Sequence, residues 1–295
     1  MSTTLDALPQ AAPLPRVRLK LRWRLRLPLL HVALVVLSLL TVMPLLWMVR
    51  TAFTPHAEVF RSTLALVPVN PTAANFPAAF GLFPVGDWFL NSLWVATACA
   101  LGKLIIAAPA AFAFARGRFP GRDAGFALVV GTMTVPYVIT LIPTYMAVVQ
   151  AGLYDTHLAV IIPTVAHCGF ACFFLRQAFR QLPAEIFEAA AIDGAGSWRQ
   201  FLLVALPNVR AALAALFVLG FLSAWNLYLW PLLVLESPEH KTLAIGLKLF
   251  ATTGEQGGQW GPLMATAMLG VAPVLILFLL AQKQIVSAFV TSGIR

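Results

Sequence analysis

The amino-acid sequence predicts an all-α membrane protein with six transmembrane helices. Of its 295 residues, 60% are hydrophobic and 11% are charged, whereas about 25% of the residues of an average soluble domain are charged. Apolar windows of about 20 residues occur repeatedly, which is the length that a helix needs to cross a hydrocarbon core about 30 Å thick. The Lys and Arg residues gather on alternate connections, as is typical of multispan membrane proteins. The predicted spans are residues 28–50, 89–114, 124–148, 158–180, 211–235 and 263–286.

Residues 1–27 form a basic tail ahead of the first span. Its stretch RVRLKLRWRLRL alternates basic and apolar residues. We interpret it as a topology signal that binds membrane lipid, because each basic side chain near anionic headgroups contributes about 1 kcal/mol. A regulatory or nucleic-acid role is the less favoured alternative. The first apolar run is too long for a signal-peptide core and lacks a small-residue cleavage site, so we expect an uncleaved span.

The placement of the basic residues predicts the orientation in the membrane. Most of the 20 Lys and Arg residues lie in the tail, in the loops after the second and fourth spans, or at the C-terminus. The loops of the other side hold only Arg61, Lys241 and Lys248. Basic residues mark the cytoplasmic face, so we expect a multi-pass membrane protein with both termini in the cytoplasm.

The sequence disfavours several energy sources and enzyme classes. All 11 Asp and Glu residues lie in the tail, in loops or at span ends, whereas a proton-driven carrier usually needs an acidic relay within the membrane. Gly102 and Lys103 lack the upstream glycine of a phosphate-binding loop. Cys168 and Cys172 are spaced i, i+4, but no second ligand pair accompanies them, so we interpret the cysteines as packing residues. We expect no cofactor on this chain and no enzymatic activity.

Residues 183–207 predict two short helices at the cytoplasmic surface. Pro183 can begin a helix without losing an internal hydrogen bond, and Glu185 and Glu188 place negative charge near its positive end. The pair Asp193-Gly194 predicts the end of this helix, because glycine readily adopts the left-handed C-cap conformation.

The second of these helices is predicted to begin at Ser197, which would form an S-x-x-Q capping box with Gln200. It carries apolar residues and is expected to end at Pro207. A body made of a helix, a bend and a second helix can fill a groove on a partner protein. The alternative is an interfacial loop that only lies on lipid.

The sequence EAAAIDGAGSWRQFLLVALP resembles the EAA loop of binding-protein-dependent ABC importer permeases. The family pattern is E-A-A, three residues, G, nine residues and I-x-L-P, and the matching positions here are Glu188, Ala189, Ala190, Gly194, Val204, Leu206 and Pro207. Valine at position 204 is a mild departure, and the second proline often found after Pro207 is missing. The stretches AFAFARGRFPGR, WNLYLWPLL and TLAIGL resemble the carbohydrate-uptake (maltose-type, type I) subgroup, on the shorter permease of its pair.

This resemblance implies a fold, partners and a role for the loop. It implies a protein of the bacterial inner membrane with a type I importer transmembrane domain over residues 28–295 and the coupling loop at about 183–207. The implied partners are a second homologous permease, two ATPase subunits that hold ATP and magnesium, and an extracytoplasmic solute-binding protein. In this family the EAA loop docks in a cleft of the ATPase. The positions that inherit this coupling role are Glu188, Ala189, Ala190, Asp193 and Gly194.

The substrate pathway of such an importer lies between its two permeases. The polar and aromatic candidates of the predicted middle spans are Asn91, Lys103, Thr132, Thr134, Tyr137, Thr140, Tyr145, His167, Trp225, Asn226, Tyr228 and Trp230. Of these we assign to the pathway Asn91, Lys103, Tyr137, Trp225, Asn226 and Tyr228, although Trp and Tyr also form interfacial belts. Lys103 lies about 20 Å along the helix from Arg116, which is too far for it to reach the inner face. Its ammonium group is therefore either a packing contact or a cation that lines the pathway.

The stretch ALGKLIIAAPAAFAF resembles sn-glycerol-3-phosphate importer permeases, and a buried cation favours an anionic phosphate. Glycerol-3-phosphate or a related glycerophosphodiester is therefore the favoured solute. A di- or oligosaccharide such as maltose or trehalose is the alternative. A secondary carrier is less favoured, because no inverted repeat with paired broken helices is evident, although a sodium site built from carbonyls stays open. No group of catalytic residues converges in the spans to support a membrane-embedded enzyme or receptor.

Overall fold

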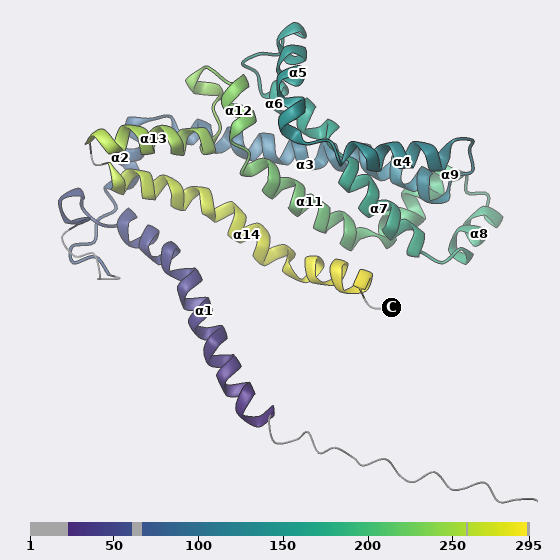
Figure 1. Ribbon diagram of the computed structural model, residues 1–295, viewed down its shortest axis with the longest axis horizontal. Coiled ribbons are helices and arrows are strands. Elements are labelled where there is room, and N and C mark those ends of the chain that lie inside the picture. Colours follow the sequence, from purple (N-terminus) through teal and green to yellow (C-terminus); the bar gives the residue numbers. More distant parts are fainter. Residues whose placement is uncertain (1–22, 61–66, 258, 294–295) are drawn as a thin grey trace, which may run out of the picture. The chain divides into compact units, whose positions relative to one another are not determined.

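The computed structural model describes residues 23–60, 67–257 and 259–293 (Figure 1). The regular structure within these ranges is entirely helical, which confirms the predicted all-α fold class. The chain divides into two separately packed units, residues 1–47 and 48–295. Residues 1–22 of the predicted basic tail lie outside the described residues, and residues 23–27 already belong to the first helix.

Helix α1 (Trp23–Ala52) supplies the described regular structure of the first unit, and its last five residues, from Met48, belong to the second. Its sequence has no Lys, Arg, Asp or Glu between Arg26 and Arg50, so nothing interrupts the apolar run. The part Leu30–Ala52 is long and apolar enough to cross a membrane. This part agrees with the span predicted at residues 28–50.

Two continuous helices of the second unit are also long enough to cross a membrane. They are α3 (Val85–Arg116) and α14 (Trp260–Gly293). The other elements, in chain order, are η1 (His56–Glu58), α2 (Asn75–Leu82), α4 (Arg122–Thr132), α5 (Tyr137–Gln150), α6 (His157–Ala166), α7 (Gly169–Gln181), α8 (Glu185–Ile192), α9 (Ser197–Arg199), the π-helix η2 (Gln200–Ala205), α10 (Leu206–Asn208), α11 (Arg210–Trp225), α12 (Leu229–Val234), η3 (Pro238–His240) and α13 (Leu243–Gly257).

Three further candidate spans are bent pairs of helices. The angle is 96° between α4 and α5, 45° between α6 and α7, and 78° between the segment Ser197–Asn208 and α11. The described residues therefore contain three continuous candidate spans, or six if each bent pair crosses the membrane once.

The continuous helix predicted for residues 124–148 is wrong. Helix α4 ends at Thr132 and α5 begins at Tyr137. The break lies at Pro136, because a proline ring disfavours the helical conformation of the residue before it, here Val135, and supplies no backbone N–H.

The helices predicted for residues 158–180 and 211–235 are also interrupted. In the first, α6 ends at Ala166 and α7 begins at Gly169. Helix α11 ends at Trp225, and the side-chain amide of Asn226 donates a hydrogen bond of 2.8 Å to the carbonyl of Leu222. Asparagine competes in this way with the backbone bonds that would continue a helix. The chain resumes helical structure only in α12.

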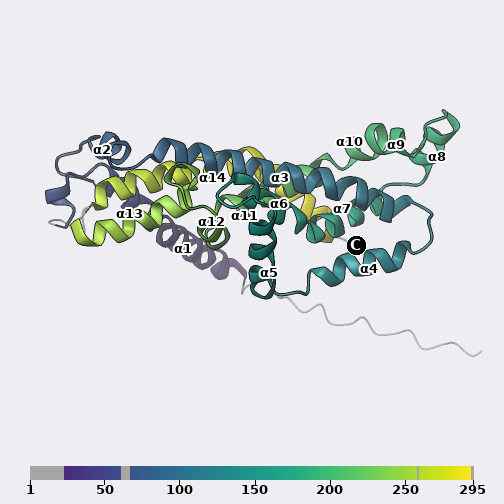
Figure 2. The same ribbon diagram turned by 90° about the horizontal axis from the view of Figure 1, so that it is seen from above.

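Helix α3 is the central element of the second unit (Figure 2). It packs against α6, α7, α11 and α13, while α11 also packs against α14. Near its N-terminus, a Cβ atom on Gly246 of α13 would lie 2.0 Å from the ring of Trp88. Only glycine therefore allows α13 to approach α3 this closely.

Candidate functional site

A cavity of about 170 Å³ lies among α3, α5, α6, α11 and α12. Ammonium, phenol, hydroxyl, imidazole and indole groups line it beside apolar side chains, a mixture that is typical of small-ligand sites. Its lining residues are Lys103, Tyr137, Leu141, Thr144, Pro163, Thr164, His167, Ser223, Leu227 and Trp230. We refer to it as the Lys103 cavity.

Lys103 supplies the positive charge of this cavity. It lies within α3 and is half-buried. Among the described residues, no carboxylate lies within ion-pair distance of its ammonium group. An anionic group of a bound solute can therefore neutralise a charge that this part of the chain does not neutralise itself.

Helix α5 presents one face to the Lys103 cavity. Tyr137, Leu141 and Thr144 follow the i, i+4, i+7 spacing of a single helix face, and all three line the cavity. The rings of Tyr137 and His167 meet edge to face, with their centroids 6.2 Å apart. The Nδ1 atom of His167 lies 2.8 Å from the carbonyl of Pro163, and this contact fixes the orientation of the imidazole.

Two of the six residues predicted for the substrate pathway, Lys103 and Tyr137, line this cavity. The other four lie elsewhere in the second unit; they are Asn91, Trp225, Asn226 and Tyr228. Trp225 is a core residue, because it is buried and its indole N–H donates a hydrogen bond of 3.1 Å to the carbonyl of Gly270. Tyr228 packs against the hydrophobic core to which Trp225 belongs.

Sequence reasoning missed Thr144, Thr164 and Ser223 as lining residues. The spacing of Thr144 from Tyr137 could have indicated a shared helix face. Thr164 and Ser223 gave no such signal, because only the packing of α6 and α11 brings their hydroxyl groups to the cavity.

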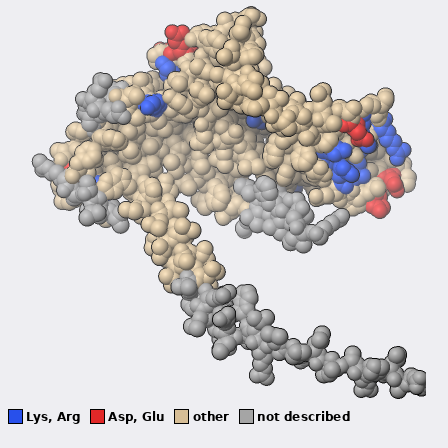
Figure 3. All heavy atoms as spheres, in the orientation of Figure 1, with Lys and Arg blue, Asp and Glu red and all other residues tan. Residues whose placement is uncertain are grey.

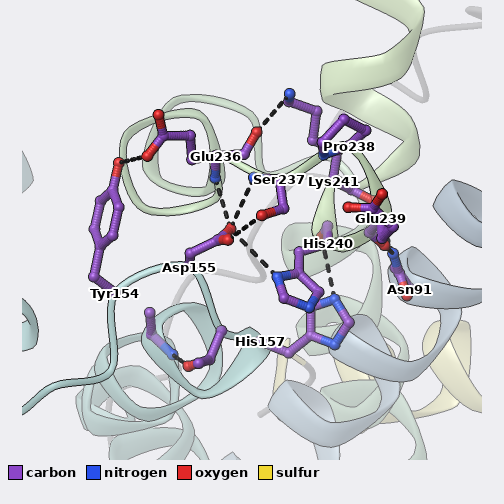
Figure 4. A network of polar contacts seen from close by, with 12 residues as sticks. Asn91, Tyr154, Asp155, His157, Glu236, Ser237, Pro238, Glu239, His240 and Lys241 are labelled. Atoms are coloured by element: carbon purple, nitrogen blue, oxygen red, sulfur yellow. Dashed lines mark hydrogen bonds and ion pairs between the residues drawn. The ribbon is translucent and has the colours of Figure 1, made fainter.

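A polar network joins the connection between α5 and α6 to the segment that follows α12 (Figure 4). Asp155 has a positive φ of 57°, and its carboxylate accepts hydrogen bonds from the backbone N–H groups of Glu236 (2.8 Å) and Ser237 (3.0 Å) and from the Ser237 hydroxyl. The Nδ1 atom of His240 lies 3.3 Å from Asp155 Oδ1. We call these four residues the Asp155 network.

The Asp155 carboxylate is held in its charged form. Partial burial raises its pKa, but the hydrogen bonds from Ser237 and Glu236 outweigh this effect and lower the pKa to about 2. Hydrogen bonds to a charged group stabilise that form. The network is therefore intact at neutral pH.

The segment after α12 is also fastened to α3. The Trp88 indole donates a hydrogen bond of 2.9 Å to the carbonyl of Pro238. The Asn91 amide donates to the carbonyls of Glu239 (2.6 Å) and Lys241 (3.1 Å). Asn91 thus holds the backbone of a connecting segment, which explains why it does not reach the Lys103 cavity.

Residues 185–208, which we call the coupling element, begin with α8 and its bend. Gly194 has a φ of +78°. Its N–H donates to the carbonyl of Ala191 (3.0 Å), and the N–H of Ala195 donates to the carbonyl of Ala190 (2.9 Å). This pair of bonds is a Schellman motif, with Asp193 as the C-cap. The predicted left-handed glycine is therefore confirmed.

The predicted capping box at Ser197 is wrong. Gly196 is the N-cap of α9, Ser197 is its first helical residue, and no side chain caps this end. The side-chain amide of Gln200 instead donates a hydrogen bond of 2.9 Å to the carbonyl of Ala195, so it is not available to Ser197. The helix then widens into η2 and continues through α10 to Asn208.

The coupling element has a buried face and an exposed face. Phe187 and Phe201 are buried. Ile192, Trp198 and Leu203 are 87%, 63% and 72% exposed, which is unusual for side chains of this size.

Two of the predicted coupling residues carry charge on the exposed face. Glu188 and Asp193 are exposed, and within the described part of the chain their carboxylates make no hydrogen bond or ion pair. Ala189 and Gly194 are exposed beside them, and Ala190 is half-buried. Figure 3 shows acidic and basic residues gathered where Figure 1 places α4, α8 and α9, whereas the surface between this region and α12 is almost free of charge on this face.

Comparison with known proteins places these features in context. Residues 103–290 match the model of a family described as binding-protein-dependent transport system inner membrane component. An arabinooligosaccharides transport system permease protein of Halalkalibacterium halodurans is 32% identical, over 90% of this chain and 96% of the relative. An sn-glycerol-3-phosphate transport system permease protein of Pectobacterium atrosepticum is 33% identical, over 89% of this chain and 95% of the relative.

Solved structures show the same fold at lower sequence identity. A chain of a bacterial ABC transporter involved in the import of the acidic polysaccharide alginate matches with a TM-score of 0.80 and 22% identity, over 90% of this chain and 98% of that chain. A chain of a bacterial alginate ABC transporter, in complex with an alginate pentasaccharide-bound periplasmic protein, matches with a TM-score of 0.63 and 16% identity, over 89% and 96%.

Proposed function

We propose that this chain, which belongs to the family of binding-protein-dependent transport system inner membrane components, moves a polar small solute into the cytoplasm. The movement occurs by alternating access and is driven by ATP. The chain is the permease component of a carbohydrate ABC importer, and its family consists of transport subunits rather than enzymes. The orientation with both termini in the cytoplasm belongs to the proposal and rests on the distribution of basic residues.

The exposed face of the coupling element is the observation that carries this proposal. Ile192, one helical turn after Glu188, and Trp198 expose large apolar side chains. The carboxylate of Glu188 has no partner among the described residues. Such a surface can bury its apolar side chains, and its charge can be paired, when it docks into a groove of another protein. We assign that groove to the ATPase subunits, which would hold ATP and magnesium, and we assign the contact to residues 188–190, 193 and 194.

The remaining partners are a second homologous permease and an extracytoplasmic solute-binding protein. The outer surface of α5 supports the first of these, because Val138, Ile139 and Ile142 are 74%, 68% and 68% exposed beside the face that lines the Lys103 cavity. A second permease and lipid would together cover this apolar surface. Membership of a binding-protein-dependent family supports the solute-binding protein as a partner.

Copurification and cross-linking test the assembly. We expect an Ala189→Cys variant, made in a chain whose three native cysteines are replaced, to cross-link to an ATPase subunit in the purified active complex. The matched control is Ala78→Cys, at an exposed alanine on α2 outside the coupling element. A chain that transports solute alone, with no ATPase captured from position 189, would contradict the proposal and support a secondary carrier instead.

Among solutes we favour glycerol-3-phosphate or a related glycerophosphodiester. The two curated relatives described above are named for different solutes and are similar to this chain to almost the same extent, 33% and 32%, so they do not decide between them. The preference rests on the Lys103 cavity, because an ammonium group without a carboxylate partner favours an anionic solute. A di- or oligosaccharide such as maltose or trehalose is the second candidate, supported by the aromatic rings of Tyr137 and Trp230 in the lining.

The substitution Lys103→Gln separates the two candidates. For a phosphate ester we expect the KM of uptake to rise by about 10-fold or more, because a charge-assisted hydrogen bond contributes about 1.5–3 kcal/mol. For a neutral saccharide we expect little change. Lys248→Gln, an exposed lysine on α13, is the matched control. Unchanged uptake of the phosphate ester by the Lys103 variant would contradict the preference for an anionic solute.

A further inference from the structure

The C-terminal end of α3 is embedded in the coupling element. The Phe112 ring lies with its centroid 5.6 Å from that of Phe179 on α7, 6.1 Å from Phe187 on α8 and 5.4 Å from Phe201 on η2. All four rings are buried. Both arms of the coupling element therefore meet α3 at one residue.

Arg116, one helical turn after Phe112, adds a polar connection at the same place. Its Nη2 atom donates a hydrogen bond of 3.1 Å to the carbonyl of Phe179 and another to the carbonyl of Leu182. Its guanidinium carbon lies 4.5 Å from the centroid of the Phe187 ring. Arg116 is thus bound both to the C-terminal end of α7, just before α8, and to the buried face of α8.

The geometry of this contact is specific to arginine. The carbonyls at the end of a helix have no partner within the helix and attract a cation. A planar guanidinium can donate to two of them in its plane while its face lies over an aromatic ring. A lysine ammonium can donate to the carbonyls but cannot present such a face.

The other end of α3 holds the segment that follows α12. Trp88 and Asn91 donate to its carbonyls, and Ser92 accepts a hydrogen bond of 2.8 Å from the N–H of Leu243. Between Ser92 and Arg116 the helix rises about 36 Å. Lys103 lies between these ends, so a single helix connects the coupling element, the Lys103 cavity and the segment after α12.

We propose that Arg116 is a positioning residue for coupling, which clamps α8 to α3 so that a displacement of α8 moves α3 and with it the wall of the Lys103 cavity. This inference rests on the proposed function, because it requires an ATPase that moves the coupling element. It adds a residue outside the docking face. The clamp depends on the guanidinium group, because the aromatic contacts of Phe112 are non-directional and do not by themselves fix the position of α8 on α3.

The test compares Arg116→Gln and Arg116→Lys with Arg118→Gln. Arg118 is an exposed arginine two residues away that makes no hydrogen bond or ion pair with the described part of the chain. The complete complex is reconstituted, and assembly, basal ATPase activity, ATPase activity with loaded solute-binding protein, and uptake are measured. We expect Arg116→Gln to assemble with unchanged basal ATPase activity and to lose stimulation and uptake by about 2- to 30-fold, the range found for residues that carry coupling. Arg116→Lys should lose less, and Arg118→Gln should match the wild type.

The variant Phe187→Leu keeps the test decisive if Arg116→Gln fails to fold. It removes the ring face but retains an apolar side chain and the two bonds from Arg116 to the carbonyls. We expect normal assembly and a smaller loss of stimulation. The double variant Arg116→Lys, Phe187→Leu should lose less than the product of the two single losses, because contacting residues that act together are not additive.

The outcomes separate this inference from the proposed function. If the wild-type chain never assembles with an ATPase, the proposed function fails. If the wild type assembles but Arg116→Lys and Phe187→Leu both couple normally, or if their effects multiply independently, the clamp is overturned and the proposed function stands.

Discussion

At the residue scale, Asp155 shows how a single unusual backbone conformation fastens two distant parts of the chain. A positive φ is rare outside glycine, and Asp tolerates it better than most residues. Here it turns the carboxylate toward the N–H groups of Glu236 and Ser237, about 80 residues later in the sequence. The composition of the 149–157 loop gave no indication of this contact, because its partners are backbone groups and carry no sequence signal.

We predict that Asp155→Asn weakens this contact measurably. The amide cannot accept from all three donors, and a lost hydrogen bond to a charged group costs about 1.5–3 kcal/mol. Hydrogen exchange of the Glu236 and Ser237 amides should therefore accelerate about 10- to 100-fold. Glu239→Gln, which removes a charge from the same segment without removing a described side-chain contact, is the control. Equal protection in both variants would contradict the assigned role of the carboxylate.

The pH dependence of the same contact follows from the lowered pKa. Because the pKa of Asp155 falls to about 2 in the folded chain, the stabilisation is fully present above the ordinary value of about 3.9. It is lost as the pH falls from about 4 to about 2. Protection of the two amides, corrected for intrinsic exchange, should decline over this range in the wild type and stay flat in Asp155→Asn.

At the scale of the element, the coupling element combines a rigid bend with a less regular second helix. The Schellman motif at Gly194 fixes the angle between its arms, and η2 replaces the α-helix that the sequence predicted. A π-helical turn is uncommon and frequently marks a functional site. The sequence predicted the bend, because the ability of glycine to adopt a positive φ depends on that residue alone, but it could not predict η2.

We predict that Gly194→Pro abolishes uptake while leaving membrane insertion intact. Proline fixes φ near −65° and has no N–H, so it cannot adopt the φ of +78° or donate to Ala191. Gly121 has the same φ of +78° at the start of α4, outside the coupling element, and Gly121→Pro is the matched control. The charge change Glu188→Lys should also abolish uptake, whereas Glu185→Lys, on the same helix, should have a smaller effect. Normal uptake by both the Gly194 and the Glu188 variant would contradict the coupling role assigned to these residues.

At the scale of the whole molecule, the apolar windows and the EAA spacing predicted the fold class and the family. The fold class follows from the hydrophobic pattern, whereas the family follows from the resemblance of residues 188–207 to a known loop motif, and both are visible in the linear sequence. The breaks at residues 133–136, 167–168 and 226–228 were missed, because the apolar runs continue across them. Pro136 and Asn226 mark the first and the last of these breaks.

The candidate site was less predictable than the fold. Lys103 was singled out because a charge in an apolar window is conspicuous, and Tyr137 because it is polar and aromatic. Trp225 met the same criterion as Tyr137 but lies in the core. Which aromatic residue faces a cavity depends on how the helices rotate against one another, and that information is not present in residue type.

The break between α4 and α5 has a consequence for the surroundings of the chain. At the 96° corner between α4 and α5, the carbonyls of Val130, Gly131 and Thr132 accept hydrogen bonds from the next three N–H groups of the chain. The first N–H groups of α5 have no partner within their own helix. Hydrocarbon tails offer no hydrogen bonds, so such backbone at bilayer depth persists only against protein or water. Tyr137, the first residue beyond the corner, lines the Lys103 cavity. If the corner lies at bilayer depth, its free N–H groups need water or a neighbouring protein rather than acyl chains beside them.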